Sequence, residues 1–361
     1  MKKTLCTLLC LMMVLTFAAC GKDKEADEET SNYTYEIGML TASDDASIDD
    51  DDDVETVWEG IRQYAEEQGK TYKFYEAAEP TVDSQMDRLK DAVDEGVKVI
   101  VASGEEISQA IYEGQKKYPE ISFIYFDGEP KNSKGKVEVG DNCVCIRFNT
   151  LQAGFLAGYG AAMEGYNSLG FIAEEKNDEA VSYCYGFLQG ANEAAKRYRR
   201  YSNVYYSYGG SAEKMGKRAE ELYQKNWVDA IFTYGPEAFD VVEAVAKENK
   251  KVVIASGVTK EYSKTVVTSA RKCYEELVAD QLDAVFAGSF KGGKSKTLGV
   301  KSGGVGLDMS KSKFTNFTKD LYKEAVQLLK SGDVKLASTK SAKTVAELTQ
   351  EQRLYYIGIY E

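Results

Sequence analysis

The chain has 361 residues, of which 43% are apolar and 29% charged, which is the composition of a globular protein with room for two domains. A formal charge of −13 repels nucleic acid polymers, so these are excluded as partners. The sequence contains no histidine, the commonest general base and metal ligand, and it lacks a nucleophile motif and a dense cysteine cluster. We therefore expect no enzymatic activity, no metal site and no cofactor.

The chain begins with a predicted lipoprotein signal peptide, residues 1–20. A short positive start precedes an apolar stretch over residues 4–15, and two alanines then lead to Cys20. The Cys20 thiol is the expected site of lipidation, although an ordinary secretory leader with an incidental cysteine would show a similar pattern. Residues 21–32 carry almost no apolar side chains and are predicted to form a disordered tether. The sequence therefore predicts a protein anchored by lipid to the outer face of the bacterial plasma membrane.

The first half of the body alternates β-rich runs with helical patterns. Strands are predicted at residues 36–40, 73–75, 98–102 and 122–126, and helices at residues 54–68, 84–95 and 107–117. Residues 97–101 are almost continuously apolar, as a strand covered on both faces requires. Cys143 and Cys145 fall on one face of a further strand, where two buried thiols are expected.

The pattern restarts after residue 149. Strands are predicted at residues 169–173, 204–206, 230–233 and 252–255, and helices at residues 151–164, 180–198, 213–225 and 238–247. A tail from residue 265 adds a strand, a helix at 272–286, a strand at 297–301 and a helix at 317–329. Two successive βα arrays predict an α/β fold with two doubly wound, Rossmann-like lobes, each built on a parallel sheet.

The extra elements of the tail suit a chain that passes three times between the lobes. These crossings are expected near Arg147, Val267 and Val300. The N-terminal lobe would then comprise residues 33–147 and 268–300, and the C-terminal lobe residues 148–267 and 301–361.

In open parallel sheets ligands bind beyond the carboxyl ends of the strands, so polar residues at strand exits are the candidate contacts. In the first lobe these are Asp44, Asp45, Ser103, Gly104 and Asp127, and in the second lobe they include Glu174, Glu175, Tyr208 and Tyr234. Asp127 ends the apolar strand 122–126, where a carboxylate is costly unless another group pairs with it. A helix cap is the alternative role for Asp127.

Residues 49–53 are five consecutive aspartates before a predicted helix. Negative charge at a helix start is favourable, although the aspartates also repel one another. The run could be a solvated loop or, through Asp53, part of a site for a cationic ligand. It lacks the alternating ligands and the glycine of a calcium-binding loop.

Motifs in a fixed order run along nearly the whole mature chain. They are Ile48-Asp49-Asp50, Trp58-Glu59-Gly60, Tyr118-Pro119-Glu120 ahead of Phe123 and Asp127, residues 153–159 (AGFLAGY), residues 169–172 (LGFI), Gly186-Phe187, Gly190-Ala191, Thr268-Ser269 with Lys272, and residues 303–307 (GGVGL). None is specific alone, but their order and spacing resemble the basic membrane protein family of substrate-binding lipoproteins. That family includes purine nucleoside receptors of ABC importers.

The resemblance implies a type I periplasmic-binding fold with a three-strand hinge, whose two lobes close on a ligand. In nucleoside-binding members the base stacks between aromatic rings, while acidic residues bind the base edge and the ribose. By position, Asp44, Asp127 and Lys272 fall where such members place polar ligand contacts. An ABC permease in the membrane is the implied partner.

Three departures from the family pattern bear on the ligand. The usual Phe-Asn before Trp-Glu-Gly is Asp53-Val54, the second stacking ring corresponds to Ala212, and the usual Asp after the last strand of the second lobe is Gly257. The usual base-stacking pair is therefore absent, and the charge of Asp53 favours a cationic or amine-bearing ligand. Tyr206, Tyr208 or Tyr234 could supply a ring instead.

We therefore expect a monomeric binding protein that captures one small polar, nucleoside-like ligand for an ABC importer. A sugar or a cationic solute is the alternative ligand. A surface sensor of the same fold, signalling to a membrane kinase, is the alternative function. Neighbouring genes for a permease and an ATPase, rather than for a kinase, would separate the two functions.

Overall fold

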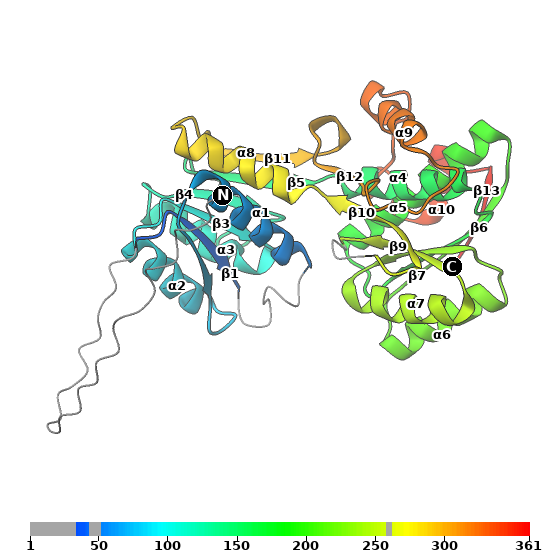
Figure 1. Cartoon of the computed structure of the whole chain (residues 1–361), viewed down its shortest axis with the longest axis horizontal. Coiled ribbons are helices and arrows are strands. Elements are labelled where there is room, and N and C mark those ends of the chain that lie inside the picture. Colours follow the sequence, from blue (N-terminus) through cyan, green and yellow to red (C-terminus); the bar gives the residue numbers. More distant parts are fainter. Residues whose placement is uncertain (1–33, 43–51, 258–261) are drawn as a thin grey trace, which may run out of the picture. The chain divides into compact units, whose positions relative to one another are not determined.

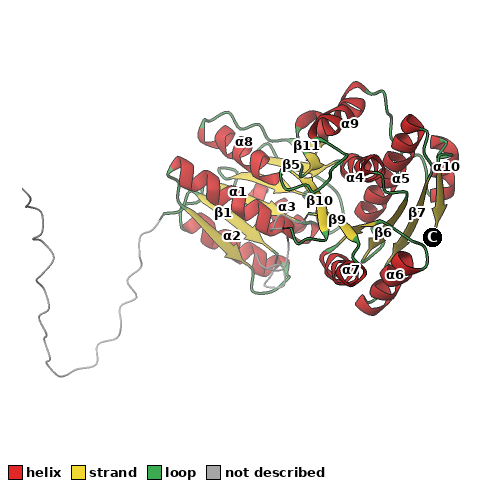
Figure 2. Cartoon of the chain, turned by 45° about the vertical axis from the view of Figure 1, so that its right-hand side comes forward, coloured by secondary structure: helices red, strands yellow, loops and turns green. Residues whose placement is uncertain are grey.

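The computed structural model describes residues 34–42, 52–257 and 262–361. The predicted leader, Cys20, the tether, Asp44, Asp45 and the first three aspartates of the acidic run lie outside these residues. Within the described part, the strands form one sheet of six strands and one of seven (Figure 1). Helices cover the sheets, as Figure 2 shows in red against the yellow strands. The predicted α/β fold with two parallel-sheet lobes is confirmed.

The first sheet has the strand order β11-β5-β4-β3-β1-β2 and is parallel throughout. Its strands are β1 (Ile37–Thr41), β2 (Tyr72–Glu76), β3 (Val99–Ser103), β4 (Ser122–Phe126), β5 (Cys143–Phe148) and β11 (Lys294–Leu298). Its helices are α1 (Asp52–Gln68), α2 (Val82–Asp94), α3 (Ser108–Lys117) and α8 (Tyr274–Phe286).

Alternate residues along these strands pack on opposite faces of the first sheet, because side chains of a strand alternate in direction. Val99 and Val101 belong to a cluster with residues of α1 and α8. Ile100 belongs to a second cluster with residues of α2 and α3. Cys143 and Cys145 also face this second cluster, with their sulfur atoms 3.9 Å apart, so the prediction of two buried thiols on one strand face is confirmed.

The second sheet has the order β12-β10-β9-β8-β6-β7-β13. Its strands are β6 (Ser168–Ala173), β7 (Ser202–Tyr208), β8 (Ala230–Tyr234), β9 (Val252–Ser256), β10 (Val266–Lys272), β12 (Val305–Leu307) and β13 (Ile357–Tyr360). The helices that follow or flank them are α4 (Thr150–Glu164), α5 (Asp178–Tyr198), α6 (Ala212–Gln224), α7 (Pro236–Asn249), α9 (Lys319–Ser331) and α10 (Val345–Gln352). All neighbouring strands are parallel except β10 and β12.

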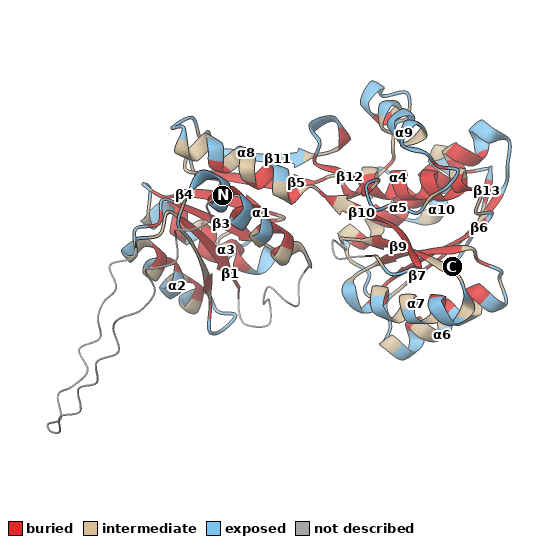
Figure 3. Ribbon diagram, in the orientation of Figure 1, coloured by how far each residue is buried: buried red, intermediate tan, exposed pale blue. Residues whose placement is uncertain are grey.

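Helices α4 and α5 pack closely enough that their glycines face backbone atoms of the other helix. The carbonyl oxygen of Phe187 lies where a Cβ on Gly158 would be, and that of Phe155 lies where a Cβ on Gly190 would be. Helix α4 is almost entirely buried, and so is the central part of α5, residues 183–192 (Figure 3). The glycines in the motifs of residues 153–159 and 186–191 therefore have a packing role, because any larger side chain would separate the two helices.

The described chain passes between the two sheets three times, after β5, after β10 and after β11. Two of the crossings lie close to the predicted positions, but the one expected near Val267 lies after Lys272, since the whole of β10 belongs to the second sheet. Lys272 was predicted to begin a helix and instead ends this strand. The strand predicted at 297–301 is shifted to β11, and residues Val300–Ser302 form a short 3-10 helix, η3. The short elements β12, α10 and β13 were not predicted.

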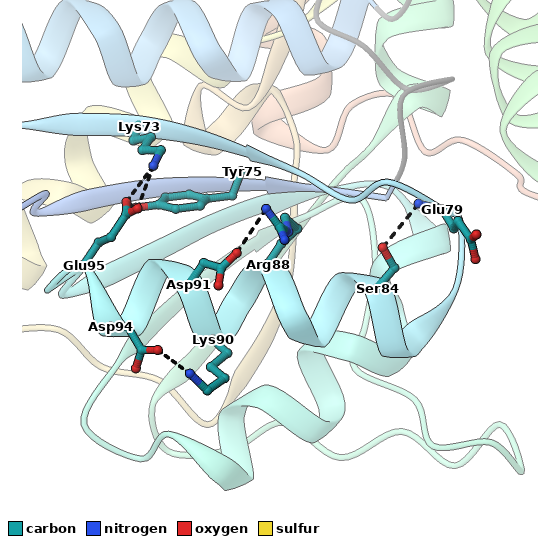
Figure 4. A network of polar contacts seen from close by, with 9 residues as sticks. All are labelled: Lys73, Tyr75, Glu79, Ser84, Arg88, Lys90, Asp91, Asp94 and Glu95. Carbon is teal, nitrogen blue, oxygen red and sulfur yellow. Dashed lines mark hydrogen bonds and ion pairs between the residues drawn. The ribbon is translucent and has the colours of Figure 1, made fainter. Parts of the chain in front are cut away.

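A network of polar contacts ties α2 to the edge of the first sheet (Figure 4). Lys73 on β2 forms an ion pair with Glu95 at 2.8 Å, and the Tyr75 hydroxyl donates to the same carboxylate at 2.7 Å. Arg88 pairs with Asp91 at 3.0 Å on the outer face of the helix. Since the Lys73 side chain is 38% exposed, its ion pair contributes about 0–1 kcal/mol to stability.

Candidate functional site

Lys272 is the centre of a cluster of charged side chains. Its side chain is only 6% exposed at the end of β10, and its ammonium nitrogen lies within ion-pair distance of three carboxylates. The distances are 2.8 Å to Asp53, 2.9 Å to Glu179 and 3.4 Å to Asp127. A lysine buried to this extent is stable only when its charge is compensated, which these carboxylates achieve.

Each carboxylate reaches Lys272 from a different element. Asp53 lies in the first turn of α1, and Glu179 lies in the first turn of α5, behind the N-cap residue Asn177. Asp127 follows β4 with a φ of 56°, a left-handed conformation that aspartate tolerates better than most residues. Its N–H donates to the Ile146 carbonyl at 2.9 Å, which fixes the backbone. Residues of both lobes therefore converge on one cation.

Aromatic side chains surround the charged groups. The Tyr274 hydroxyl donates to Asp127, and the Tyr234 hydroxyl donates to Glu179 at 3.2 Å. The rings of Phe148 and Tyr274 are 4.7 Å apart, and each lies 5.9 Å from the Lys272 nitrogen. Tyr183 packs against Tyr234 at a centroid distance of 5.5 Å. The site thus combines ionic groups with aromatic surface, as polar small-molecule sites do.

The environment shifts the proton affinities of these groups. Burial, together with the neighbouring Asp53 and Glu179 carboxylates, raises the pKa of the Asp127 carboxyl to about 7, although Lys272 and the hydrogen bond from Tyr274 oppose this rise. Burial alone would lower the pKa of the Lys272 ammonium, but the three carboxylates outweigh burial and raise it well above its usual value. With all groups ionised, three negative charges face one positive charge, so the cluster favours a positively charged or proton-donating partner.

Four of the residues predicted from the sequence meet at this cluster. They are Asp53, Asp127, Lys272 and, through Glu179, Tyr234. The structure gives other roles to Gly104, whose carbonyl accepts a hydrogen bond from the Tyr125 hydroxyl at 2.7 Å, and to Tyr208, whose buried hydroxyl lies beside the Cys184 thiol. Ser103 is the last residue of β3 and is half-buried.

Sequence reasoning missed the acidic residue from the second lobe. It considered Glu174 and Glu175, directly after β6, as strand-exit residues. Glu174 instead accepts a hydrogen bond from the Glu237 N–H at 3.1 Å, at the start of α7. Glu179 reaches Lys272 from the first turn of the next helix, and extending the search by one helical turn beyond each strand would have found it. Tyr274, Tyr183 and Phe148 are buried and carry no such signal.

Two of the three departures from the family pattern are neighbours in the structure. Gly257 follows β9 with a φ of 76°, and a Cβ placed on it would lie 3.9 Å from the Asp53 carboxylate oxygen Oδ1. The carboxylate that the family pattern expects after β9 is therefore absent, while Asp53 places one close to that position from the other lobe. This part of the site therefore still carries an acidic group, which comes from α1 instead of from the residue after β9.

Two surface pockets, of about 420 and 440 Å³, lie in the described part of the chain. Neither is lined by Lys272 or by its three carboxylate partners. Within the described ranges, no group of three or more histidine, cysteine or acidic side chains is arranged to hold a metal ion. No helix in the same ranges has the length and apolar character needed to cross a bilayer.

Comparison with known families decides the assignment. The Bmp family model, described as ABC transporter substrate-binding protein PnrA-like, matches residues 37–339. The chain belongs to the Bmp family. This confirms the resemblance inferred from the ordered motifs and makes the chain a substrate-binding protein of the ABC transporter type, a class that acts outside the cytoplasm.

Relatives of this Bmp protein cover most of its length. The ABC transporter nucleoside-binding protein BmpA of Lactococcus lactis subsp. cremoris (strain MG1363) is 22% identical over 354 residues, which cover 91% of this chain and 97% of BmpA. Basic membrane protein D of Borreliella burgdorferi (strain JD1) is 23% identical over 255 residues, or 69% of this chain and 72% of that protein. Both identities are low enough for ligands to differ.

Solved structures show the same fold. An ABC transporter solute-binding protein from Aeropyrum pernix K1 superposes with a TM-score of 0.68 at 18% identity, covering 88% of this chain and 97% of that one. A transcriptional activator of the comK gene from Bacillus halodurans superposes with a TM-score of 0.64 at 21% identity, covering 82% and 96%. The two-lobed Bmp architecture is therefore that of ABC solute-binding proteins.

Proposed function

We propose that this protein is a lipid-anchored receptor that captures a small, nucleoside-like ligand carrying an amine or a positive charge, and delivers it to an ABC permease. The observation that carries the proposal is the Lys272 cluster, where carboxylates from both lobes surround one buried cation. The nucleoside class is supported by the relationship to the Lactococcus protein, which is named as nucleoside-binding. The preference for an amine is supported by the excess of negative charge.

The cluster suggests how ligand binding and lobe closure are linked. Asp127 belongs to the first lobe and Glu179 to the second, and Lys272 now bridges them. A ligand amine that bonds to one or both carboxylates takes over part of this bridging role, while Lys272 remains able to donate to a ligand hydroxyl. Because the contacts on both sides exist only when the lobes are together, they favour the closed arrangement of a hinge equilibrium.

Binding of a solute panel to the ligand-free protein tests the proposed ligand class. Nucleosides, bases, sugars and amine-bearing solutes are compared by thermal shift and then by calorimetry, because a ligand of the native state raises the melting temperature. We expect the hits to carry an amine or a positive charge. For such a hit, Asp53→Asn should weaken binding by about tenfold or more, since a hydrogen bond to a charged group contributes about 1.5–3 kcal/mol.

The matched control is Glu59→Gln, which removes a carboxylate from the exposed side of the same helix, where Glu59 pairs with Arg62. This variant should bind the hit as the unaltered protein does. A neutral sugar that binds tightly, with no loss of affinity in Asp53→Asn, would contradict the proposed ligand class.

Lipid anchoring is tested at Cys20. In a Gram-positive host the unaltered protein should fractionate with membranes, and Cys20→Ser should release it into the medium because no thiol remains for the diacylglycerol. Cys10→Ser, a change within the apolar stretch of the leader, is the control and should leave the protein on the membrane. Retention of Cys20→Ser on membranes would place the anchor elsewhere in the chain.

A further inference from the structure

A surface pocket of about 420 Å³ lies beside two of the three segments that join the lobes. Its wall contains Arg271 from the end of β10, Cys273 from the crossing that follows it, and Val300 and Gly303 from the crossing after β11. The remaining wall comes from Glu276 of α8, from β12 and from α9, whose Val326 contributes apolar surface. None of the groups already assigned to the ligand cluster takes part.

The strand periodicity separates this pocket from the Lys272 cluster. Successive residues of a strand point to opposite faces, so Lys272 enters the acidic cluster while its neighbours Arg271 and Cys273 face the pocket. Opposite Arg271 on the neighbouring strand is Gly306, whose lack of a side chain makes room for the Tyr322 hydroxyl, 2.7 Å from where a Cβ would be. The two sites are therefore distinct, although one chain segment forms part of both.

The pocket is apolar at its base and positively charged at its rim. Among the lining residues, Arg271, Lys323 and Lys330 supply three positive charges and Glu276 one negative charge, while Asp320, outside the lining, pairs with Lys323 at 3.0 Å. One terminal nitrogen of Arg271 bonds to Glu275 at 2.9 Å, but its Nε is buried and has no hydrogen-bond acceptor. A buried donor without an acceptor costs free energy, so the ion pair with Glu275 leaves the Arg271 guanidinium only partly satisfied.

We propose that this pocket is a second binding site, which takes a small organic anion with an apolar body and a single acidic head group. The apolar wall of Val305, Leu307 and Val326 suits the body, and Arg271 suits the head group. The adjoining pocket of about 440 Å³ is lined by Glu67, Glu275 and Glu276 against Arg271 alone, so it repels an anion. The Lys272 cluster, with its excess of carboxylates, does the same.

A pair of fluorescent probes tests the proposal on the full chain. Anilinonaphthalene sulfonate carries an apolar body with one sulfonate, and N-phenylnaphthylamine has the same ring system without the charge. We expect saturable fluorescence enhancement with the sulfonate probe. The neutral probe should bind at least about tenfold more weakly, because it cannot form a hydrogen-bonded charge pair with Arg271. Equal affinities for the two probes would overturn the proposed role of the cationic rim.

Variants of the rim provide the second part of the test. Arg271→Met removes the charge but retains an apolar chain of similar length, and it should weaken binding of the sulfonate probe at least about tenfold. Lys330→Gln should weaken binding of this probe about threefold. Lys319→Gln removes a charge from the same helix at a position that does not line the pocket, and should have no effect. Should Arg271→Met fail to fold, the comparison of Lys330→Gln with Lys319→Gln still decides, and equal effects of these two would overturn the proposal.

Cys273 allows the bound probe to be located. It is partly exposed, whereas the other three cysteines of the described ranges, Cys143, Cys145 and Cys184, are buried. Burial raises the pKa of the Cys273 thiol to about 11, so labelling with N-ethylmaleimide is carried out at alkaline pH and quantified by peptide mass spectrometry. Saturating sulfonate should slow labelling of Cys273, and Lys330→Gln should reduce this protection. Fluorescence enhancement with unchanged Cys273 labelling would place the probe elsewhere and overturn the assignment.

Discussion

Replacing Lys272 with methionine should destabilise the protein by about 3–5 kcal/mol at neutral pH, the cost of removing one partner from a buried ion pair. The variant keeps the apolar length of the side chain but leaves three carboxylates, at 2.8 to 3.4 Å from the former ammonium position, without their common cation. Urea unfolding at constant ionic strength measures the change. A loss below about 1 kcal/mol would show that the cluster is solvated like a surface network.

The pH dependence of this loss has a defined sign. The pKa of Asp127 is already raised to about 7 in the folded protein, mainly by burial, and Lys272 opposes this rise more strongly than the hydrogen bond from Tyr274 does. Without Lys272 the folded variant takes up protons more readily than the unfolded chain, so its stability increases as the pH falls from about 8 towards 5. The difference between variant and unaltered protein should therefore shrink on acidification.

The control is Lys73→Met in the exposed network of α2 (Figure 4). Lys73 also pairs with a carboxylate at 2.8 Å, but its side chain is 38% exposed, compared with 6% for Lys272. We expect a loss of less than about 1 kcal/mol, because water and salt compensate an exposed ion pair. A loss as large as that of Lys272→Met would show that burial does not account for the difference between the two lysines.

Adenosine, guanosine and inosine should bind weakly, with affinities about two to four decades below those of a site with both stacking rings. Each ring that stacks on a base contributes about 1–3 kcal/mol, and 1.4 kcal/mol corresponds to one decade. Of the rings around Lys272, Phe148, Tyr183 and Tyr274 are buried against other protein groups, and only Tyr234 retains moderate exposure. Submicromolar binding in calorimetry would show that the tyrosines form a new stacking site.

If the missing ring limits the affinity for purine nucleosides, a variant that adds an aromatic ring should bind them more tightly. Ala212 is the first residue of α6, and the family resemblance places the second stacking ring at this position. Ala212→Phe should tighten adenosine binding by about one to two decades, whereas Ala212→Leu, which adds bulk without an aromatic face, should add far less. Equal gains from both variants would indicate that the added apolar area, rather than stacking, determines affinity.

The alternation of apolar strands and helical patterns was sufficient to predict both sheets, because parallel strands covered on both faces leave a strong local signal. The boundary at Lys272 could not be read in this way. Two charged residues at 271 and 272 suggest an exposed helix start, and the burial of Lys272 depends on Asp53, a partner 219 positions away in the sequence. Strand β11 was misplaced for a related reason, since its residues 294–297 are exposed and mostly polar at a sheet edge.

The candidate site was predictable where its residues follow strands directly, as Asp127 does. Asp53 was found because it departs from the family pattern, although its contact with Lys272 was not foreseen. Glu179 was missed because it lies in the first turn of α5, behind the N-cap residue Asn177, whereas the candidates were taken only from residues directly after each strand. The pairing of Gly257 with Asp53 lies beyond any local rule, since it requires the placement of one lobe's strand exit beside the other lobe's first helix.

The segment Arg271-Lys272-Cys273 also limits how the gene can change. Each of these side chains reaches its environment because of its place in a two-residue repeat, with Lys272 among carboxylates and its neighbours on the other side of the strand. Deleting or inserting one codon between Ala270 and Tyr274 would exchange the two sides of the strand. The Cys273 thiol or the inserted residue would then lie among the carboxylates, and Lys272 would face the pocket on the opposite side. Point substitutions here alter one contact, whereas a change of length alters all of them together.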